Sequence, residues 1–186
     1  MIILNVRIGV SNRHVHLRKD DFVKLFGDVD FKLDKDLYQT GQFASIYRVT
    51  VRTKKGKLMN VRVLGPFRDY TQVEISRTDA YKLGINPPVR SSGDLDGSSV
   101  VTLIGPHGCI VTNGCIIADR HIHISPEDKE KYGLSDNLSV MVGNVKKSIL
   151  YDVHLKVAPG SKLEFHIDTD DANGNLVKTG DYGEIK

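Results

Sequence analysis

Four of the seven histidines in the chain lie in two short and nearly identical segments. These segments are RHVHL at residues 13–17 and RHIHI at residues 120–124. In a β-strand, residues two apart point to the same face, so each segment presents two imidazoles on one side and aliphatic side chains on the other. Neutral imidazole is a common ligand of zinc-like metals. The two pairs therefore predict metal binding, in the simplest case as one site with four histidine ligands.

The histidine pairs belong to a longer pattern that occurs four times. Each copy starts with His or Glu, continues with Leu or Ile, and has Asp five residues after its start. The starting positions are His16, Glu74, His123 and His166. Three copies have Ser or Asp where a helix would begin, a variant of the capping box. The repeat predicts strands that end in a metal ligand and turn directly into a helix, which adds Glu74 and His166 to the candidate ligands. The alternative is a duplicated structural motif whose histidines bond to backbone groups.

The elements that must position these residues are short strands rich in β-branched residues, separated by turns and small helices. Helices are predicted at residues 20–26, 76–83 and 125–132 from apolar spacing, capping residues and closing glycines. Residues 33–43 are predicted to form a loop, and residues 169–186 a partly loose tail. The predicted strands cover residues 2–10, 14–17, 44–52, 58–64, 71–75, 100–104, 109–112, 115–118, 138–142, 148–157 and 162–167.

Many short strands with small helices predict a mainly β fold, and the recurrence of the histidine motif indicates a duplicated module. We therefore expect two small β-barrels in close association, divided into residues 1–90 and 91–186. The polar loop at residues 90–98 is expected to be the linker between them, or a nest of backbone amides that binds an anion.

Composition excludes several classes of protein. The hydrophobic content is 40% and the charged content 26%, as in ordinary globular proteins. The net charge of +3 does not indicate nucleic-acid binding but suits a small anionic ligand. No apolar run is long enough for a membrane span, and the start does not resemble a signal peptide. Cys109 and Cys115 form no disulfide framework, so we expect two core thiols in a cytoplasmic protein.

The chain resembles a known family, the PduL-type phosphotransacylases (phosphate propanoyltransferases). The resemblance covers nearly the whole chain, from residue 11 to residue 173. The matching segments are SNRHVHL at 11–17, GQFA at 41–44, NVRVLGP at 60–66, Arg68, TQVEIS at 71–76, PVR at 88–90, SGDL at 92–95, RHIH at 120–123, HIDTD at 166–170 and Ala172-Asn173. The sequence departs from the family at residues 34–36, where paired lysines are usual, and at residues 38–40, where Ser-Gln-Pro is usual.

The resemblance implies a duplicated two-barrel fold that carries two zinc ions. One ion would be held by His14, His16 and Glu74, and the other by His121, His123 and His166. It also implies coenzyme A contacts from Ser11, Lys35, Arg62, Leu64 and Asn173. Members that enter bacterial microcompartments have an amphipathic N-terminal extension, whereas residues 2–10 are predicted to form a strand here, so we expect a free cytoplasmic enzyme.

The family transfers an acyl group between coenzyme A and inorganic phosphate, with propanoyl- or acetyl-CoA as the expected substrate. Arg68 would hold the phosphate, since a guanidinium binds phosphate through two parallel hydrogen bonds. No serine or cysteine stands beside a base, so direct attack by phosphate is expected. Two alternatives stay open, a dinuclear zinc thioester hydrolase and a non-catalytic metal-stabilised binding module. No nucleic acid or membrane partner is expected, and homo-oligomerisation is left open.

Overall fold

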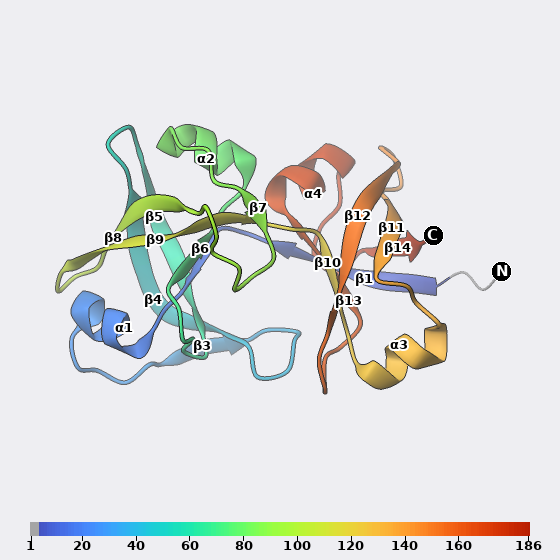
Figure 1. The fold of residues 1–186 in the computed structure, drawn as a ribbon, viewed down its shortest axis with the longest axis horizontal. Helices are drawn as coiled ribbons and strands as arrows, with labels where there is room; N and C mark the ends of the chain where they lie inside the picture. The colour runs from blue at the N-terminus through green and yellow to red at the C-terminus, as the bar shows by residue number, and fades with distance from the viewer. Residues whose placement is uncertain (1–3) are drawn as a thin grey trace. The chain divides into compact units, whose positions relative to one another are not determined.

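A computed structural model describes residues 4–186 of the chain. The described residues form short strands and four short helices, α1 (Lys19–Phe26), α2 (Arg77–Leu83), α3 (Pro126–Tyr132) and α4 (Thr169–Asn175) (Figure 1). The strands are β1 (Leu4–Ser11), β2 (His14–His16), β3 (Leu33–Asp36), β4 (Phe43–Arg52), β5 (Lys57–Gly65), β6 (Gln72–Glu74), β7 (Val89–Arg90), β8 (Ser99–Ile104), β9 (Cys109–Ala118), β10 (His121–Ile124), β11 (Asn137–Val142), β12 (Ser148–Val157), β13 (Glu164–Asp168) and β14 (Tyr182–Ile185). The mainly β fold predicted from the sequence is confirmed.

The chain divides into two compact units. One unit, which we call the inserted barrel, is the continuous segment Arg13–Ala118. The other, the terminal barrel, combines the described residues up to Asn12 with Asp119–Lys186. The predicted division at residue 90 differs from this one because β8 and β9 pair with β4 and β6 and so belong to the inserted barrel.

Six strands of the inserted barrel pair into a closed ring. The order around the ring is β4–β5–β2–β6–β9–β8, and β8 returns to β4. The strands β3 and β7 are added outside this ring, on β4 and β9. Because the ring is closed, its six strands leave no unpaired edge.

The terminal barrel is a closed ring of the same kind, with the order β1–β13–β10–β12–β11–β14. Its pairings match those of the inserted barrel one by one. In both rings the histidine strand is parallel to one neighbour (β5 or β12) and antiparallel to the strand with the third candidate ligand (β6 or β13). Both predicted barrels are therefore present as duplicates of one topology.

The two duplicates exchange their first strands. The strand β1 has the same position in its ring as β9 has in the other. Each is parallel to the strand that carries the third candidate ligand, β13 for β1 and β6 for β9. Each is also antiparallel to the next strand in its ring, β14 for β1 and β8 for β9. Yet β1 precedes the histidine strand of the inserted barrel in the chain and pairs within the terminal barrel. The strand β9 does the reverse. The duplication therefore begins at β1 and again at β9, and neither half of the sequence closes a ring by itself.

Each barrel has its own apolar core. The largest buried side chains of the inserted barrel include Phe22, Leu25 and Leu103, and those of the terminal barrel include Ile122 and Phe165. The valine or isoleucine between the two histidines of each pair points into these cores, because Val15 and Ile122 are fully buried. The imidazoles consequently lie on the opposite, outer face of the ring.

The strand-to-helix turns predicted by the fourfold repeat are all present. The helices α1, α2, α3 and α4 follow β2, β6, β10 and β13 directly. Ser76, Ser125 and Asp168 cap the last three helices, each accepting the amide of the Asp three residues later. Arg18 at the start of α1 makes no side-chain cap.

Two local predictions were wrong. The loop predicted at residues 33–43 contains β3, whose charged and exposed residues pair with β4 along one edge only. The tail predicted to be partly loose at residues 169–186 forms α4 and β14, because β14 is needed to close the terminal ring. Residues 2 and 3 of the first predicted strand lie outside the described residues. No helix in residues 4–186 is long and apolar enough to span a membrane.

The exchange of first strands makes a prediction about fragments. The fragment Arg13–Ala118 contains all six strands of its ring and should fold alone. The fragment Asp119–Lys186 lacks β1 and should not, because β13 and β14 each lose a partner. Circular dichroism and thermal unfolding of the two purified fragments would measure this difference.

A permuted fragment provides the matched control. Leu4 lies opposite Ile185 in the antiparallel pair of β1 and β14, so a three-residue loop made of Lys186 and an added Asn-Gly can join Ile185 to Leu4. The fragment Asp119–Lys186, followed by Asn-Gly and then by Leu4–Asn12, should unfold cooperatively. Equal folding of the extended and unextended fragments would contradict the assignment of β1.

Candidate metal centres

The first candidate centre lies on the outer face of the inserted barrel. His14 and His16 are on β2, and the antiparallel register puts His14 directly opposite Glu74 of β6. All three residues are more than nine-tenths buried. The Nε2 atom of His14 lies 3.4 Å from Oε2 of Glu74, and the imidazoles of His14 and His16 meet edge to face. The strand pairing therefore brings together the three residues that the repeat and the resemblance indicated.

The second candidate centre repeats this arrangement in the terminal barrel. His121 and His123 are on β10, and His121 lies directly opposite His166 of β13. The Nε2 atoms of His121 and His123 are 3.3 Å apart, and the ring centroid of His166 lies 4.6 Å from that of His123. His121 is buried, whereas His123 and His166 are partly exposed. The register of the three ligand positions is the same in both barrels.

The tautomer of His121 follows from its surroundings. Its Nδ1 lies 3.0 Å from the carbonyl oxygen of Asp119, which can only accept a hydrogen bond. Nδ1 therefore carries the proton, and Nε2 keeps its lone pair. A backbone carbonyl on one ring nitrogen is the usual way in which a ligating imidazole is oriented.

Both groups suit a divalent metal ion. In each, one ligand atom from every residue lies within 4.8 Å of the other two. Zinc binds imidazole nitrogen and carboxylate oxygen at about 2.0–2.2 Å, so atoms this close can meet one ion after small side-chain adjustments. Three protein ligands also leave a coordination position for substrate, as catalytic zinc sites do. The donor sets, His₂Glu and His₃, thus fit two separate ions rather than one four-histidine site.

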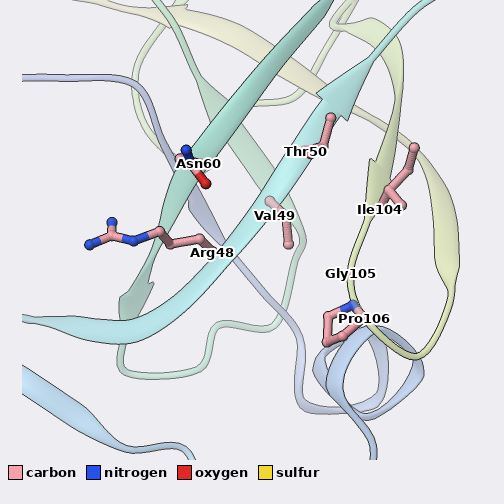
Figure 2. A pocket seen from close by; sticks show the side chains of 7 residues that line it. All are labelled: Arg48, Val49, Thr50, Asn60, Ile104, Gly105 and Pro106. Atoms are coloured by element: carbon pink, nitrogen blue, oxygen red, sulfur yellow. The ribbon is translucent and has the colours of Figure 1, made fainter.

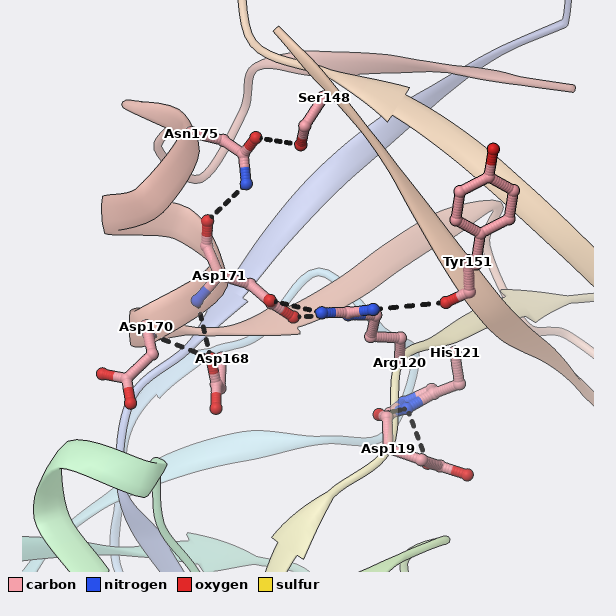
Figure 3. Close-up of polar contacts among 9 residues, drawn as sticks. All are labelled: Asp119, Arg120, His121, Ser148, Tyr151, Asp168, Asp170, Asp171 and Asn175. Carbon is pink, nitrogen blue, oxygen red and sulfur yellow. Dashed lines mark hydrogen bonds and ion pairs between the residues drawn. The ribbon is translucent and has the colours of Figure 1, made fainter. Parts of the chain in front are cut away.

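An arginine beside each histidine pair bonds the helix that follows the third ligand. Arg13 donates to Oδ1 of Asp79 at 2.7 Å, and Arg120 donates to both carboxylate oxygens of Asp171 at 2.7 Å (Figure 3). These aspartates are the fifth residues after Glu74 and His166, which gives the repeated Asp a physical role in two of its four copies. Each bond ties the start of a histidine strand to the helix that follows the strand of the third ligand.

The electrostatics around Arg120 follow from this contact. Its hydrogen bonds to Asp171 raise the pKa of the guanidinium above the ordinary arginine value, against the opposing effect of burial. Burial raises the pKa of the Asp168 carboxyl, which caps α4 through the amides of Asp170 and Asp171. Figure 3 shows this cap beside the Arg120–Asp171 pair.

The residue two positions before each third ligand contacts it. Gln72 donates from Nε2 to Oε1 of Glu74 at 2.6 Å. In the terminal barrel Oε2 of Glu164 lies 2.8 Å from Nε2 of His166, and Arg7 forms an ion pair with Glu164. Both residues face the same side of their strand as the ligand two positions later.

Arg68 is held beside the end of the first histidine strand. Its backbone amide donates to the carbonyl of Leu17, and its Nη2 donates to Oε1 of Gln42 at 2.7 Å. Its Nε is buried and has no hydrogen-bond partner among the described residues. A cationic donor that is buried and unsatisfied suits an anion in this position. Gln42 was present in the sequence motif, yet nothing in the sequence indicated that it holds Arg68.

The residues implied to contact coenzyme A lie in both units. In the inserted barrel, Arg62 and Leu64 of β5 are directly opposite His14 and His16, and Lys35 is exposed on β3. Arg62 donates to the carbonyl of Ser45 and pairs with Asp34. In the terminal barrel, Ser11 ends β1 opposite Asp168, and Asn173 is exposed on α4. Their contacts with coenzyme A stay a prediction.

A shallow hollow of about 230 Å³ lies elsewhere on the inserted barrel. It is lined by Arg48, Val49, Thr50, Asn60, Ile104, Gly105 and Pro106 (Figure 2). None of the candidate metal ligands is among these residues. Its arginine, on β4, is exposed and lies opposite Arg62 in the strand register.

The polar loop at residues 90–98 lies within the inserted barrel and does not join the two units. It lies between β7 and β8, both of which pair with β9. Its amides are used within the chain, because Gly93 donates to Gln72, Asp94 to Ser91, and Asp96 to the Asp94 carboxylate. The loop supports Gln72 instead.

The two cysteines differ, which corrects the expectation that both are core residues. Cys115 is fully buried, and burial raises the pKa of its thiol to about 12. Cys109 is exposed at the start of β9, next to the hairpin turn. Both are free thiols.

Comparisons with known proteins agree on one family. A sequence model of the family described as phosphate propanoyltransferase matches residues 7–178. The chain is 49% identical to the phosphate propanoyltransferase of Thermotoga maritima over 179 residues, which cover 94% of this chain and 85% of that protein. It is 48% identical to the protein of that name from Shewanella putrefaciens, with the same coverage. The corresponding protein of Priestia megaterium is 47% identical over 183 residues, 96% of this chain and 84% of that one.

The tight approach of β1 to the second centre gives a testable substitution. A Cβ atom on Gly9 would lie 2.8 Å from Cδ2 of His166 and 2.9 Å from Cδ of Glu164. Gly9→Ala should therefore lower the free energy of unfolding by about 1–3 kcal/mol, as overpacking does, and weaken metal binding in the terminal barrel. Thermal unfolding and metal titration measure the two effects.

Gly174→Ala is the matched control, because a Cβ there meets nothing within 4 Å. An alanine in this helix should be neutral or stabilise the protein by about 0.5–1 kcal/mol. Gly9→Ala behaving like this control would contradict the close approach of β1.

The thiols make a second prediction. At pH 8, a maleimide or iodoacetamide reagent should modify Cys109 rapidly and Cys115 only after denaturation, because the thiolate is the reactive form and burial keeps Cys115 protonated. The raised pKa also means that the native state holds this proton more tightly than the unfolded state. The free energy of unfolding should consequently fall as the pH rises above about 9. Mass spectrometry of tryptic peptides would identify the modified residue, and rapid labelling of Cys115 in the native protein would contradict its burial.

Proposed function

The chain belongs to the phosphate propanoyltransferase family, and we propose that it transfers an acyl group between coenzyme A and inorganic phosphate. The observation that carries this proposal is the pair of three-residue donor sets in identical strand register, the first of them buried and beside Arg68. The reaction is acyl-CoA plus phosphate giving acyl phosphate plus coenzyme A. Propanoyl-CoA and acetyl-CoA are the substrates that we expect.

Two zinc ions per chain would complete the enzyme. His14, His16 and Glu74 would hold one, and His121, His123 and His166 the other. Zinc bound by three protein ligands supplies Lewis acidity toward a thiolate, a carbonyl or a phosphate oxygen at its open position. A cytoplasmic location remains our expectation for this enzyme.

Arg68 would bind the attacking phosphate. Its Nη2 is committed to Gln42, and its Nε is the buried donor that awaits a partner. The contact with Gln42 limits the rotation of the guanidinium, so the remaining donors keep one direction. Such fixed donors stabilise negative charge that develops during a reaction without having to reorient.

Arg62, Leu64 and Lys35 would contact coenzyme A from the inserted barrel, and Ser11 and Asn173 from the terminal one. Arg62 is fixed by Ser45 and Asp34, which suits recognition of an anionic group. Ser11 and Asn173 supply neutral hydrogen-bonding groups.

We expect the acyl group to pass directly from coenzyme A to phosphate, without an acyl-enzyme. A phosphate oxygen forms a bond with the thioester carbonyl carbon, and the carbon–sulfur bond then breaks to release the thiolate of coenzyme A. An acyl-enzyme would need an activated nucleophile, and burial keeps the Cys115 thiol protonated. The chain would thus act by orienting both substrates and stabilising charge.

A phosphate-dependent assay tests the proposal. The purified protein is given acetyl-CoA or propanoyl-CoA with and without phosphate, and free thiol and acyl phosphate are both measured. Thiol release that requires phosphate, with equal acyl phosphate formed, is the expected result. Thiol release without phosphate would indicate a hydrolase. Metal-dependent folding without any turnover would indicate a binding module.

Arg68 is the residue whose removal should affect this assay most directly. Arg68→Ala should lower turnover by about 10²–10³-fold, the usual cost of one preorganised donor. It should also raise the KM for phosphate. Arg52→Ala, at an exposed position of β4, is the matched control and should retain turnover. Full turnover of Arg68→Ala at saturating phosphate would show that Arg68 is not the phosphate anchor.

A further inference from the structure

Gln72 is a buried polar side chain with every partner defined. It is fully buried. Its Oε1 accepts the amide of Gly93 at 2.8 Å, so Nε2 must face the other way. From there Nε2 donates to Oε1 of Glu74 at 2.6 Å and to Oγ of Ser92 at 2.9 Å. The glutamine therefore holds Oε1 of the Glu74 carboxylate, while Oε2 lies 3.4 Å from Nε2 of His14.

Gly93 is suited to this task by its backbone conformation. Its φ of +100° lies in a region of backbone conformation that residues other than glycine rarely adopt. In this conformation its amide points at Gln72. The loop, the glutamine and the glutamate thus form one connected series.

Glu164 has the position of Gln72 in the terminal barrel. It is 2% exposed, faces the same side of β13 as His166, and accepts from Nε2 of His166 at 2.8 Å. Its other oxygen pairs with Arg7 of β1. A carboxylate that accepts from one ring nitrogen leaves the lone pair on the other, which fixes both the tautomer and the orientation of the ring.

The chemistry of these two residues is complementary to that of their ligands. Glu74 is an anion, and its neighbour is a neutral hydrogen-bond donor. His166 would bind a metal ion as a neutral imidazole, and its neighbour is a carboxylate. Each pair of positions therefore carries one carboxylate. In the inserted barrel it is the ligand, Glu74, and in the terminal barrel it is the neighbour of the ligand, Glu164. A dication held by three neutral imidazoles lacks the negative charge that Glu74 provides in the other centre, and Glu164 can supply it at close range.

We propose that Gln72 and Glu164 are the positioning residues of the two metal centres, Gln72 orienting the carboxylate of Glu74 and Glu164 orienting and polarising the ring of His166. The inference rests on the proposed function, since it requires that both donor sets bind metal. Each centre then has one residue that binds a ligand side chain without binding the metal itself. The difference between the ligands Glu74 and His166 explains why equivalent positions of β6 and β13 carry an amide at position 72 and a carboxylate at position 164.

The test measures metal affinity separately in each barrel. The full-length chain is stripped of metal and titrated with zinc against a chromophoric chelator. His16→Ala removes the inserted-barrel centre, so that only the terminal centre is titrated, and His123→Ala does the reverse. In the first background Glu164→Gln, which keeps the shape of the side chain and removes its charge, should weaken zinc binding by about 10–100-fold.

In the second background, Gln72→Met should weaken zinc binding by a similar factor, because it keeps the volume and removes the donor. Glu184→Gln on β14, whose carboxylate pairs with Lys186, is the matched control and should leave zinc affinity unchanged. Thermal unfolding of the metal-free variants separates positioning from folding, since a merely structural role would lower stability and leave the zinc affinity of the folded chain unchanged.

The outcomes separate this inference from the function on which it rests. A wild-type chain that fails to bind two zinc ions would overturn the proposed metal centres themselves. Two tight sites in the wild-type chain, with unchanged affinity in the Glu164→Gln and Gln72→Met variants, would overturn the positioning roles alone. Loss confined to the barrel that carries the substitution is the result that supports them.

Discussion

The candidate chemistry depends on the antiparallel register between each histidine strand and the strand of its third ligand. His14 lies opposite Glu74, and His121 lies opposite His166. A shift of either pair by one residue would turn one set of ligands into the core. The buried Val15 and Ile122 exclude such a shift, because they fill the barrel interiors. Core packing, through the alternation of a β-strand, therefore fixes the positions of the donor atoms on the outer face.

The short helices hold this register from outside. Each begins at the end of a ligand strand, and in two cases an arginine beside the histidine pair bonds an aspartate in its first turn. The contact spans two strands and one helix, so it opposes sliding of the strands and rotation of the helix together. Gln72 and Glu164 act one level closer, on the ligand side chains themselves. Backbone register, helix contacts and side-chain partners thus restrict the donors at three successive scales.

The sequence was sufficient to predict the features that have a local cause. The strand-to-helix turns and the capping residues followed from spacing within a few residues, and so did the choice of the candidate ligands that the strands bring together. The two barrels followed from the repeat. The exchange of β1 and β9 could not be predicted, because it depends on which of two equivalent rings a strand joins, and both offer it the same partners. The contacts of Gln72 with Gly93 and of Arg68 with Gln42 were also missed, since they join residues whose proximity depends on loop conformations. The strand β14 was missed because its four residues, YGEI, show no strand pattern of their own and acquire their structure only by closing a ring.

The exchange of first strands has a consequence for the origin of the molecule. A chain of half this length would carry one histidine strand, one third-ligand strand and a first strand that it cannot use itself. Two such chains could close two rings by trading first strands, as a symmetric homodimer with identical centres. Fusion of two copies of the gene would remove the requirement for symmetry, because each copy could then mutate independently. The pairs Gln72–Glu74 and Glu164–His166 are the kind of divergence that a homodimer forbids and a fused chain permits, and they leave one molecule with two centres of different charge distribution.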